Sequence, residues 1–136
     1  MFELFEHTAD LGLRVRADDR NGLFRDAGRG LFAMIVEPAP HGEPVERRTF
    51  SIDGDRDDFL LFDWLNELLY VFETERKLFG DFEVSISDRG LEARGSAFEL
   101  DLRSYRLLRE VKAITYHGLK VERTQDGWLA EVIVDI

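Results

Sequence analysis

The chain has 136 residues, of which 44% are hydrophobic and 12% aromatic, and its formal net charge is −10. This length and apolar content predict one domain, over residues 1–136, with its own core. The absence of cysteine excludes disulfide frameworks and thiolate metal sites. The negative charge argues against direct binding of nucleic-acid backbones, although an acidic protein can still meet a basic protein partner.

The sequence begins with the acids Glu3 and Glu6 instead of a basic segment followed by a long apolar run. A secretory signal has the opposite pattern. No stretch approaches the roughly 20 apolar residues that span a bilayer. We therefore expect a cytoplasmic protein with no membrane partner.

The first third of the chain predicts two strands and a helix. Apolar residues alternate with polar ones over residues 2–4 and 11–17, on either side of a polar break at residues 6–10. Apolar residues then recur at helical spacing up to residue 35. Asp18 or Asp19 is the expected N-cap of this helix, because a carboxylate there accepts hydrogen bonds from the first turn.

The middle of the chain predicts a loop over 37–44, a strand over 45–52 and a second helix over 57–73. Trp64 falls on the apolar side of this helix and is expected to anchor the core. Four polar residues of the same helix share one stripe. They are Asp63, Asn66, Glu67 and Tyr70. This stripe is either a second acidic site or a solvated helix face.

The last third predicts two hairpins, over residues 82–95 and 119–134, with a β-favouring segment over 111–116 between them. Two helices interleaved with about seven strands favour the α+β class. We expect a two-layer α/β sandwich, in which a mostly antiparallel or mixed sheet has both helices on one face.

Four segments of the sequence resemble the archease family. They are HTADLG at residues 7–12, WLNELLY at 64–70, VKAITYHGLKV at 111–121 and GWLAEVIVDI at 127–136. Each segment alone is weak, but their order and spacing extend over nearly the whole chain. The resemblance departs from the family pattern in two places. The family usually has Glu where this chain has Ser96, and an Arg-His pair where it has Ser104-Tyr105.

This resemblance implies a function and a partner. Archeases are small protein cofactors of the RtcB-type RNA ligase, which joins RNA ends in tRNA splicing and RNA repair. They promote guanylylation of the ligase and support its multiple turnover. By this resemblance the chain is a non-catalytic activator of such a ligase. A general chaperone and a metal-dependent phosphoesterase are the alternatives from other functional classes.

The resemblance also implies a divalent metal site at Asp10, Asp135 and Ile136, with calcium as the ion in the family and magnesium or manganese as the alternatives. Two side-chain carboxylates and the terminal carboxylate would supply the oxygen ligands that hard cations prefer. Without the resemblance, Asp10 would be read as capping a turn and Asp135 as lying at a frayed chain end.

Four further residues of the family segments are candidates for contacts with the ligase. They are His7, Lys112, Tyr116 and His117. The last three combine a basic, an aromatic and an imidazole side chain in one short stretch. The competing interpretation is an ordinary strand whose residues alternate between core and surface.

Overall fold

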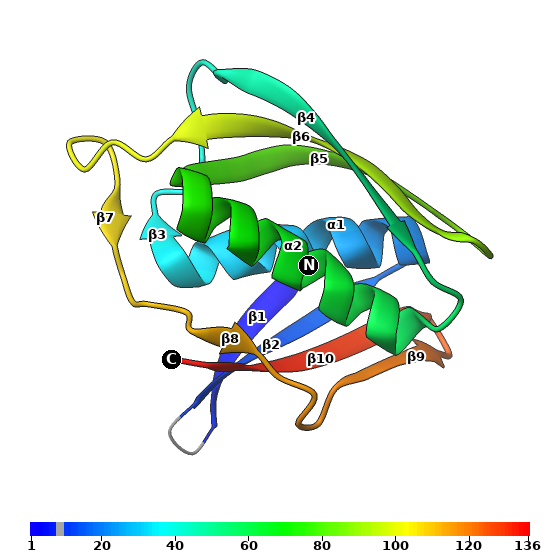
Figure 1. Cartoon of the computed structure of the whole chain (residues 1–136). Helices are drawn as coiled ribbons and strands as arrows, with labels where there is room; N and C mark the ends of the chain where they lie inside the picture. The colour runs from blue at the N-terminus through cyan, green and yellow to red at the C-terminus, as the bar shows by residue number, and fades with distance from the viewer. Residues whose placement is uncertain (8–9) are drawn as a thin grey trace.

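The computed structural model describes residues 1–7 and 10–136, and for His7 it describes the backbone alone. Two helices lie between a five-stranded sheet and a three-stranded sheet (Figure 1). The helices are α1 (Arg20–Ile35) and α2 (Asp57–Glu75). The strands are β1 (Phe2–His7), β2 (Asp10–Ala17), β3 (Val36–Glu37), β4 (Glu46–Asp53), β5 (Lys77–Ser87), β6 (Gly90–Glu99), β7 (Arg106–Leu107), β8 (Ala113–Ile114), β9 (Lys120–Thr124) and β10 (Gly127–Asp135).

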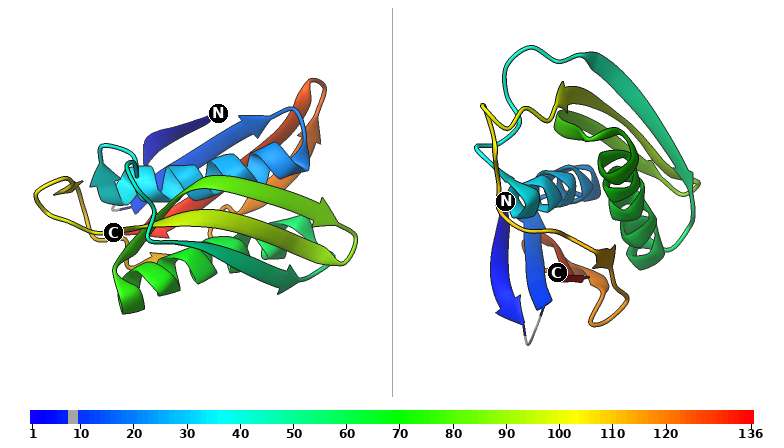
Figure 2. Two further views of the ribbon diagram at one scale, coloured as in Figure 1. Left: turned by 90° about the horizontal axis from the view of Figure 1, so that it is seen from above. Right: turned by 60° about the vertical axis from the view of Figure 1, so that its left-hand side comes forward.

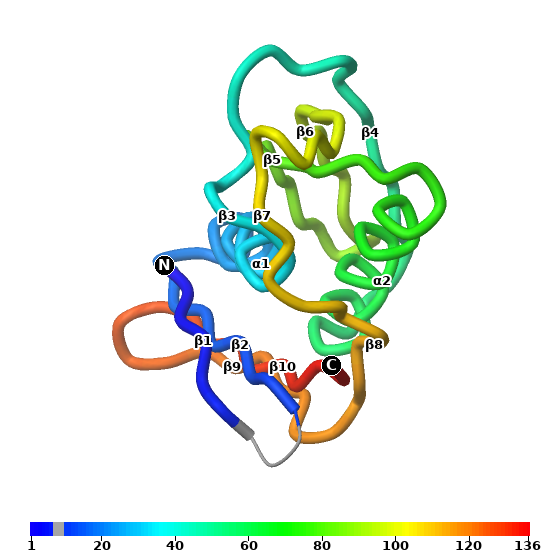
Figure 3. The backbone as a smooth tube through the Cα atoms, turned by 90° about the vertical axis from the view of Figure 1, so that its left-hand side faces the viewer, coloured from blue at the N-terminus to red at the C-terminus, as the bar shows by residue number. Residues whose placement is uncertain are grey.

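The five-stranded sheet is built around β10. Strand β2 pairs with one edge of β10 along its length, and β1 pairs with the far side of β2. The other edge of β10 is shared, because β9 pairs with Gly127–Glu131 and β8 with Val134 and Asp135. All these pairings are antiparallel. The C-terminal end of β10 is therefore held between β2 and β8, as Figure 3 also shows.

The three-stranded sheet has the order β4–β6–β5, again antiparallel, and β3 and β7 form a separate two-stranded pair. Figure 2 shows this sheet on the side of the helices away from β1 and β2. The 82–95 hairpin predicted from the sequence is longer in the structure, because β5 begins directly after α2.

Helix α1 begins where the sequence predicts. The Asp19 side chain accepts a hydrogen bond from the Gly22 backbone N–H at 2.7 Å, which caps the first turn. Two glycines let α1 pack closely on both sides. A Cβ at Gly30 would lie 2.5 Å from Leu13 of β2, and one at Gly28 would lie 3.0 Å from Phe82 of β5. These close contacts compensate for the helix propensity that glycine lacks.

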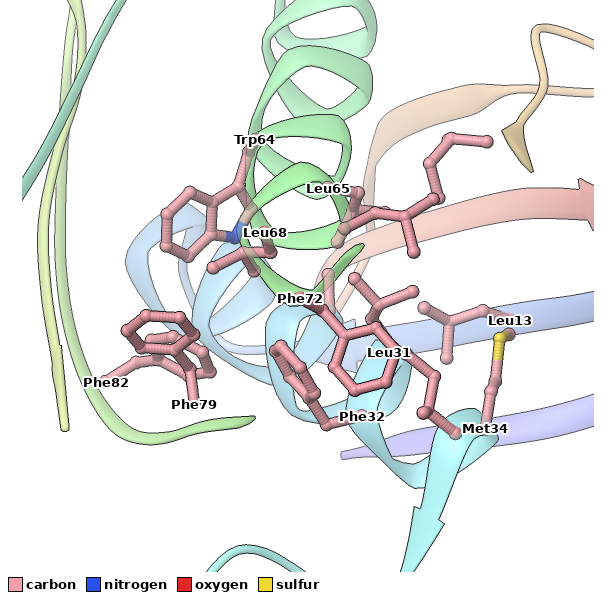
Figure 4. Close-up of a cluster of buried hydrophobic side chains, with 14 of the residues drawn as sticks. Leu13, Leu31, Phe32, Met34, Trp64, Leu65, Leu68, Phe72, Phe79 and Phe82 are labelled. Carbon is pink, nitrogen blue, oxygen red and sulfur yellow. The ribbon is translucent and has the colours of Figure 1, made fainter. Parts of the chain in front are cut away.

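Helix α2 contributes the largest side chain of the core. Trp64 has no exposed surface, and its Nε1–H donates a hydrogen bond to the Phe24 carbonyl of α1 at 2.9 Å. Its ring meets Phe50 and Phe82 edge to face, with centroids 5.4 and 5.6 Å apart. Figure 4 shows Trp64 beside the aromatic rings of β5. The prediction that Trp64 anchors the core is confirmed.

The predicted α+β class, with two helices on one face of a mostly antiparallel sheet, is confirmed. The strands divide into separate sheets, and the three-stranded sheet packs on the helices from the opposite side. The β-favouring segment 111–116 forms only the short strand β8, because β9 already occupies most of the free edge of β10. No helix among the described residues is long and apolar enough to cross a membrane.

Candidate functional site

Asp10 and Asp135 come from opposite ends of the chain and lie side by side in the five-stranded sheet. They are direct register partners on the antiparallel strands β2 and β10. Side chains in such positions share one face of the sheet, with Cβ atoms about 4.5–5.5 Å apart. The sheet therefore brings together two of the three residues predicted to hold a metal ion.

This pair lies on the outer face of the five-stranded sheet. The neighbouring register partners Leu11 and Val134 are buried and belong to the core. Because successive side chains of a strand point to opposite faces, Asp10 and Asp135 point away from the helices. Asp135 is exposed and Asp10 is half-buried. The carboxylates are therefore on a surface that an ion or a partner can reach.

The backbone around the pair is fixed on both sides. The Lys112 N–H donates a hydrogen bond to the Asp135 carbonyl at 2.8 Å, and Ala113 is the register partner of Asp135 on β8. Ile136, the last residue of the sequence, is half-buried and packs its side chain against the core. All three predicted ligand residues thus lie at one end of adjacent strands.

The residues at this end fit a hard divalent cation. Like charges directly opposite one another destabilise a sheet, and a cation between the carboxylates relieves that repulsion. Carboxylate oxygens are also the donors that calcium and magnesium prefer. Among the described residues, no three His, Asp or Glu side chains gather closely enough to hold a metal ion. Ile136, the third predicted ligand residue, follows Asp135 directly in the chain.

His7 is the register partner of Asp10 on β1. Its side chain, together with Thr8 and Ala9 of the same family segment, lies outside the described residues. The prediction that His7 contacts a partner therefore stays a prediction.

A charge-balanced row crosses the same outer face further along the strands. The Arg14 guanidinium lies 3.2 Å from a Glu3 carboxylate oxygen and 3.1 Å from one of Glu131, and the Lys120 ammonium lies 3.1 Å from Glu131. Burial alone would raise the pKa of Glu131, but the hydrogen bonds from Lys120 and Arg14 leave that pKa below its ordinary value. The charge of Arg14 is thus shared between two carboxylates of this row.

An apolar contact separates the balanced row from the aspartate pair. A Cβ at Gly12 would lie 2.2 Å from the Phe5 ring, so the ring lies directly on the glycine backbone. The Arg14 guanidinium lies over this ring, 4.5 Å from its centroid. Glycine at this position of the family segment 7–12 is therefore required by the close approach of Phe5.

Two of the residues predicted to contact the ligase, Lys112 and Tyr116, lie near α2. Tyr116 is 61% exposed and stacks on Phe62 with ring centroids 3.9 Å apart, while Phe59 meets Tyr116 edge to face at 6.0 Å. Lys112 and His117 are also exposed. The aromatic stack was not predicted from the sequence. Its only signal was Phe62, an aromatic residue beside the polar stripe of the second predicted helix.

The polar stripe of α2 borders a groove of about 660 Å³. Its walls come from Asp63, Asn66, Glu67 and Tyr70, from the end of β4 and from Lys112 next to β8. The stripe is therefore a solvated helix face that also forms one wall of a concave surface.

Both departures from the family pattern have structural roles in this chain. Ser96 is buried and accepts a hydrogen bond from the Arg47 guanidinium at 2.7 Å. The Tyr105 hydroxyl donates to the His41 carbonyl at 3.1 Å and accepts from the His41 N–H at 3.0 Å. Tyr105 thereby fastens the proline-containing loop 38–44.

The archease protein family (MTH1598/TM1083) matches residues 2–136 of the chain. The chain belongs to the archease family. Protein archease of Pyrococcus furiosus is 37% identical over 140 residues, with 99% of this chain and 98% of the relative covered. Protein archease of Methanopyrus kandleri is 38% identical over 142 residues, with 99% of each covered. The predicted family is therefore confirmed by relatives that match over nearly their whole length.

Two solved structures of this family resemble the fold. The solution structure of protein 1598 of Methanobacterium thermoautotrophicum has a TM-score of 0.79 and 30% identity, covering 99% of this chain and 98% of that one. The crystal structure of a Thermotoga maritima archease, described as a possible chaperone, has a TM-score of 0.67 and 20% identity, covering 100% and 98%. The second likeness concerns the fold alone.

Proposed function

We propose that this archease family member is a non-catalytic activator of an RtcB-type RNA ligase in tRNA splicing or RNA repair. It would promote guanylylation of the ligase and its multiple turnover. The observation that carries this proposal is the family match over residues 2–136. The acidic composition supports it, because an enzyme that binds RNA presents basic surface to which a protein of net charge −10 is attracted.

The proposal includes a divalent metal ion, calcium or alternatively magnesium or manganese. Asp10, Asp135 and the terminal carboxylate of Ile136 would hold it. The ion would supply positive charge at the end of β2 and β10. The protein's own contribution is to keep two carboxylates in register on a rigid sheet, since preorganised ligands bind without reordering the chain.

Two roles are open to this ion. It could lock the chain ends together, or it could be presented or exchanged at the nucleotide site of the ligase. The end of β10 is already paired on both sides, with Asp10 on β2 and with Ala113 on β8. Asp135 itself is exposed. These features favour presentation to the partner over a purely structural lock.

The test is an RNA-ligation assay with the RtcB-type ligase of the same genome, with and without this protein. We expect wild-type protein to raise guanylylation and turnover. Asp10→Asn and Asp135→Asn should lose most of that stimulation, whereas Asp126→Asn in the exposed β9–β10 turn should retain it. Folded variants of the aspartate pair that stimulate fully would remove the metal from the mechanism. No effect of the wild-type protein would overturn the proposed function.

A general chaperone is the second candidate, favoured by the exposed aromatic stack of Phe59, Phe62 and Tyr116. Exposed aromatic surface can hold the apolar segments of unfolded clients. The test is suppression of heat-induced aggregation of an unrelated client protein. A chaperone would suppress it at substoichiometric amounts and would lose this activity in Tyr116→Ala. A partner-specific activator would leave the aggregation unchanged.

A further inference from the structure

The exposed side of α2 carries an aromatic stack that its own fold does not cover. Phe59 is 44% exposed and Tyr116 is 61% exposed, although each contacts another aromatic ring. The Arg56 guanidinium lies 4.1 Å from the Phe59 centroid and borders the stack. Exposed aromatic groups of this kind, rimmed by polar residues, are typical of protein interfaces.

The groove described above is lined by α2 residues that follow Phe59 and Phe62 along the helix. Four of its lining residues are acids: Asp53, Asp63, Glu67 and Glu73. Among the described residues, none of these four carboxylates forms an ion pair, and Lys112 is the one cationic side chain of the lining. By contrast, Glu75 at the end of the same helix is paired with Arg48 at 2.8 Å. The groove therefore keeps a net negative charge that the fold does not neutralise.

We infer that the exposed side of α2 from Phe59 to Glu73, together with Lys112 and Tyr116, docks a basic segment of a partner protein that carries an apolar anchor. We call this surface the α2 face. The apolar anchor would pack on the aromatic stack, and arginine or lysine side chains would enter the acidic groove. The inference rests on the proposed function insofar as the RNA ligase is the partner that supplies this segment.

The negative charge of the groove favours one kind of binding partner over the others. A nucleic acid could stack on the aromatic rings, but its phosphates would face the four carboxylates of the groove. A second copy of this chain, placed symmetrically on the α2 face, would bring the same carboxylates against one another. A basic protein segment with an apolar anchor would form favourable contacts with both the acidic groove and the aromatic stack. Such segments are expected on an enzyme that binds RNA.

The inference is tested first with two charge-reversal variants. Asp63→Lys/Glu67→Lys changes the acidic groove, and Glu43→Lys/Asp126→Lys makes the same change in net charge at exposed loop positions. We expect the first variant to bind the ligase about tenfold or more weakly, and the control to bind close to wild type. Equal losses in both variants would overturn the inference, because they would show attraction by net charge alone. Melting curves confirm that both variants are folded.

Tyr116→Ala tests the aromatic part of the α2 face. Removing the outer ring of the stack should weaken binding about tenfold, as truncation of an exposed aromatic anchor does at other interfaces. Tyr116→Phe keeps the ring and should bind like wild type. If both variants bind equally well, the aromatic stack has no part in docking and the inference is wrong.

Mapping by NMR separates this inference from the proposed function. Labelled protein is titrated with the ligase, with a short synthetic peptide of alternating arginine and leucine, and with oligouridylate RNA. Shifts of α2 and β8 amides with the ligase support the inference, and so do such shifts with the peptide if the ligase does not bind. Ligase-induced shifts confined to the outer face of β2 and β10 overturn it but leave the proposed function intact. Preferential RNA binding at the aromatic stack, or no response to either protein probe, also overturns it.

Discussion

Two rows of charged residues cross the outer face of the five-stranded sheet, and they are built in opposite ways. In the first row the charge alternates from strand to strand, through Glu3, Arg14, Glu131 and Lys120. In the second row Asp10 stands directly opposite Asp135, and His7 is the register partner of Asp10 on β1. The same two strands, β2 and β10, form the centre of both rows. Sheet geometry alone therefore does not explain the like-charged pair.

The difference separates a structural arrangement from a functional one. Cross-strand pairs of opposite charge stabilise a sheet by about 0.2–1 kcal/mol, and like charges opposite one another destabilise it. The balanced row follows this rule at every step. The aspartate pair breaks it at the place where the family resemblance implies a metal ion. A local cost to stability that a ligand can reverse is expected of a binding site.

The largest expected effect is stabilisation of the aspartate row by metal. At a free calcium concentration of 100 times Kd, binding to the folded protein should raise the free energy of unfolding by about 2.7 kcal/mol. Asp135→Asn removes a ligand and should lose most of this gain, whereas Glu131→Gln should retain it. Thermal unfolding with calcium and with a chelator measures both. An equal response of the two variants would place the ion elsewhere.

Gly12→Ala should disrupt the contact between Gly12 and the Phe5 ring, which lies between the two rows. The new methyl group would lie 2.2 Å from the Phe5 ring, so the ring must move off the β2 backbone and its contact with Arg14 must change. We expect a loss of about 1–2 kcal/mol in the free energy of unfolding, as for overpacking beneath a half-buried ring. Denaturant unfolding measures it. Phe5→Leu combined with Gly12→Ala should recover part of the loss, and no recovery would contradict the clash.

The helices could be predicted from the sequence because their signals are local. The Asp19 N-cap and the recurrence of apolar residues lie within α1 itself, and the position of Trp64 within α2 likewise indicates its burial. The short β8 could not be predicted. Its length depends on how β9 and β8 divide one edge of β10, which the sequence of residues 111–116 does not contain.

The candidate site also depends on contacts between distant segments, which local sequence patterns do not predict. No local pattern joins Asp10 to Asp135, so only the family resemblance brought them together, and the register of β2 and β10 now gives that pairing a physical basis. The aromatic stack was missed because Phe62 and Tyr116 meet only when segment 111–121 crosses α2. Contacts between distant segments are settled by packing, and periodicity within one element cannot reveal them.

Neutralising one carboxylate in each row should change stability in opposite directions. In the metal-free protein, Asp135→Asn removes the like-charge repulsion and should raise the free energy of unfolding by about 0.5 kcal/mol. Glu131→Gln weakens two charge-assisted hydrogen bonds, at 3.1 Å from both Arg14 and Lys120, and should lower it by about 0.5–1 kcal/mol. Denaturant unfolding in chelator measures both changes. A change in unfolding free energy of the same sign in both variants would show that the two rows do not differ electrostatically.

The smallest effect is the pH dependence of the balanced row. The hydrogen bonds from Lys120 and Arg14 outweigh the effect of burial and hold the pKa of Glu131 below its ordinary value of 4.5. A carboxylate whose pKa is lower in the folded state binds protons more readily when unfolded. Its contribution to stability is therefore complete above pH 4.5 and is lost as the pH falls through the folded-state pKa.

The measurable quantity is the difference in unfolding free energy between the wild-type protein and Glu131→Gln. This difference should be constant from about pH 7 to about pH 5 and should shrink below that range, because protonated Glu131 and glutamine are then alike in charge. The experiment is done in chelator, so that metal binding at Asp10 and Asp135 does not contribute. A difference that persists unchanged to about pH 3 would mean that Glu131 supports the sheet through packing, and the contrast between the two rows would then rest on the aspartate pair alone.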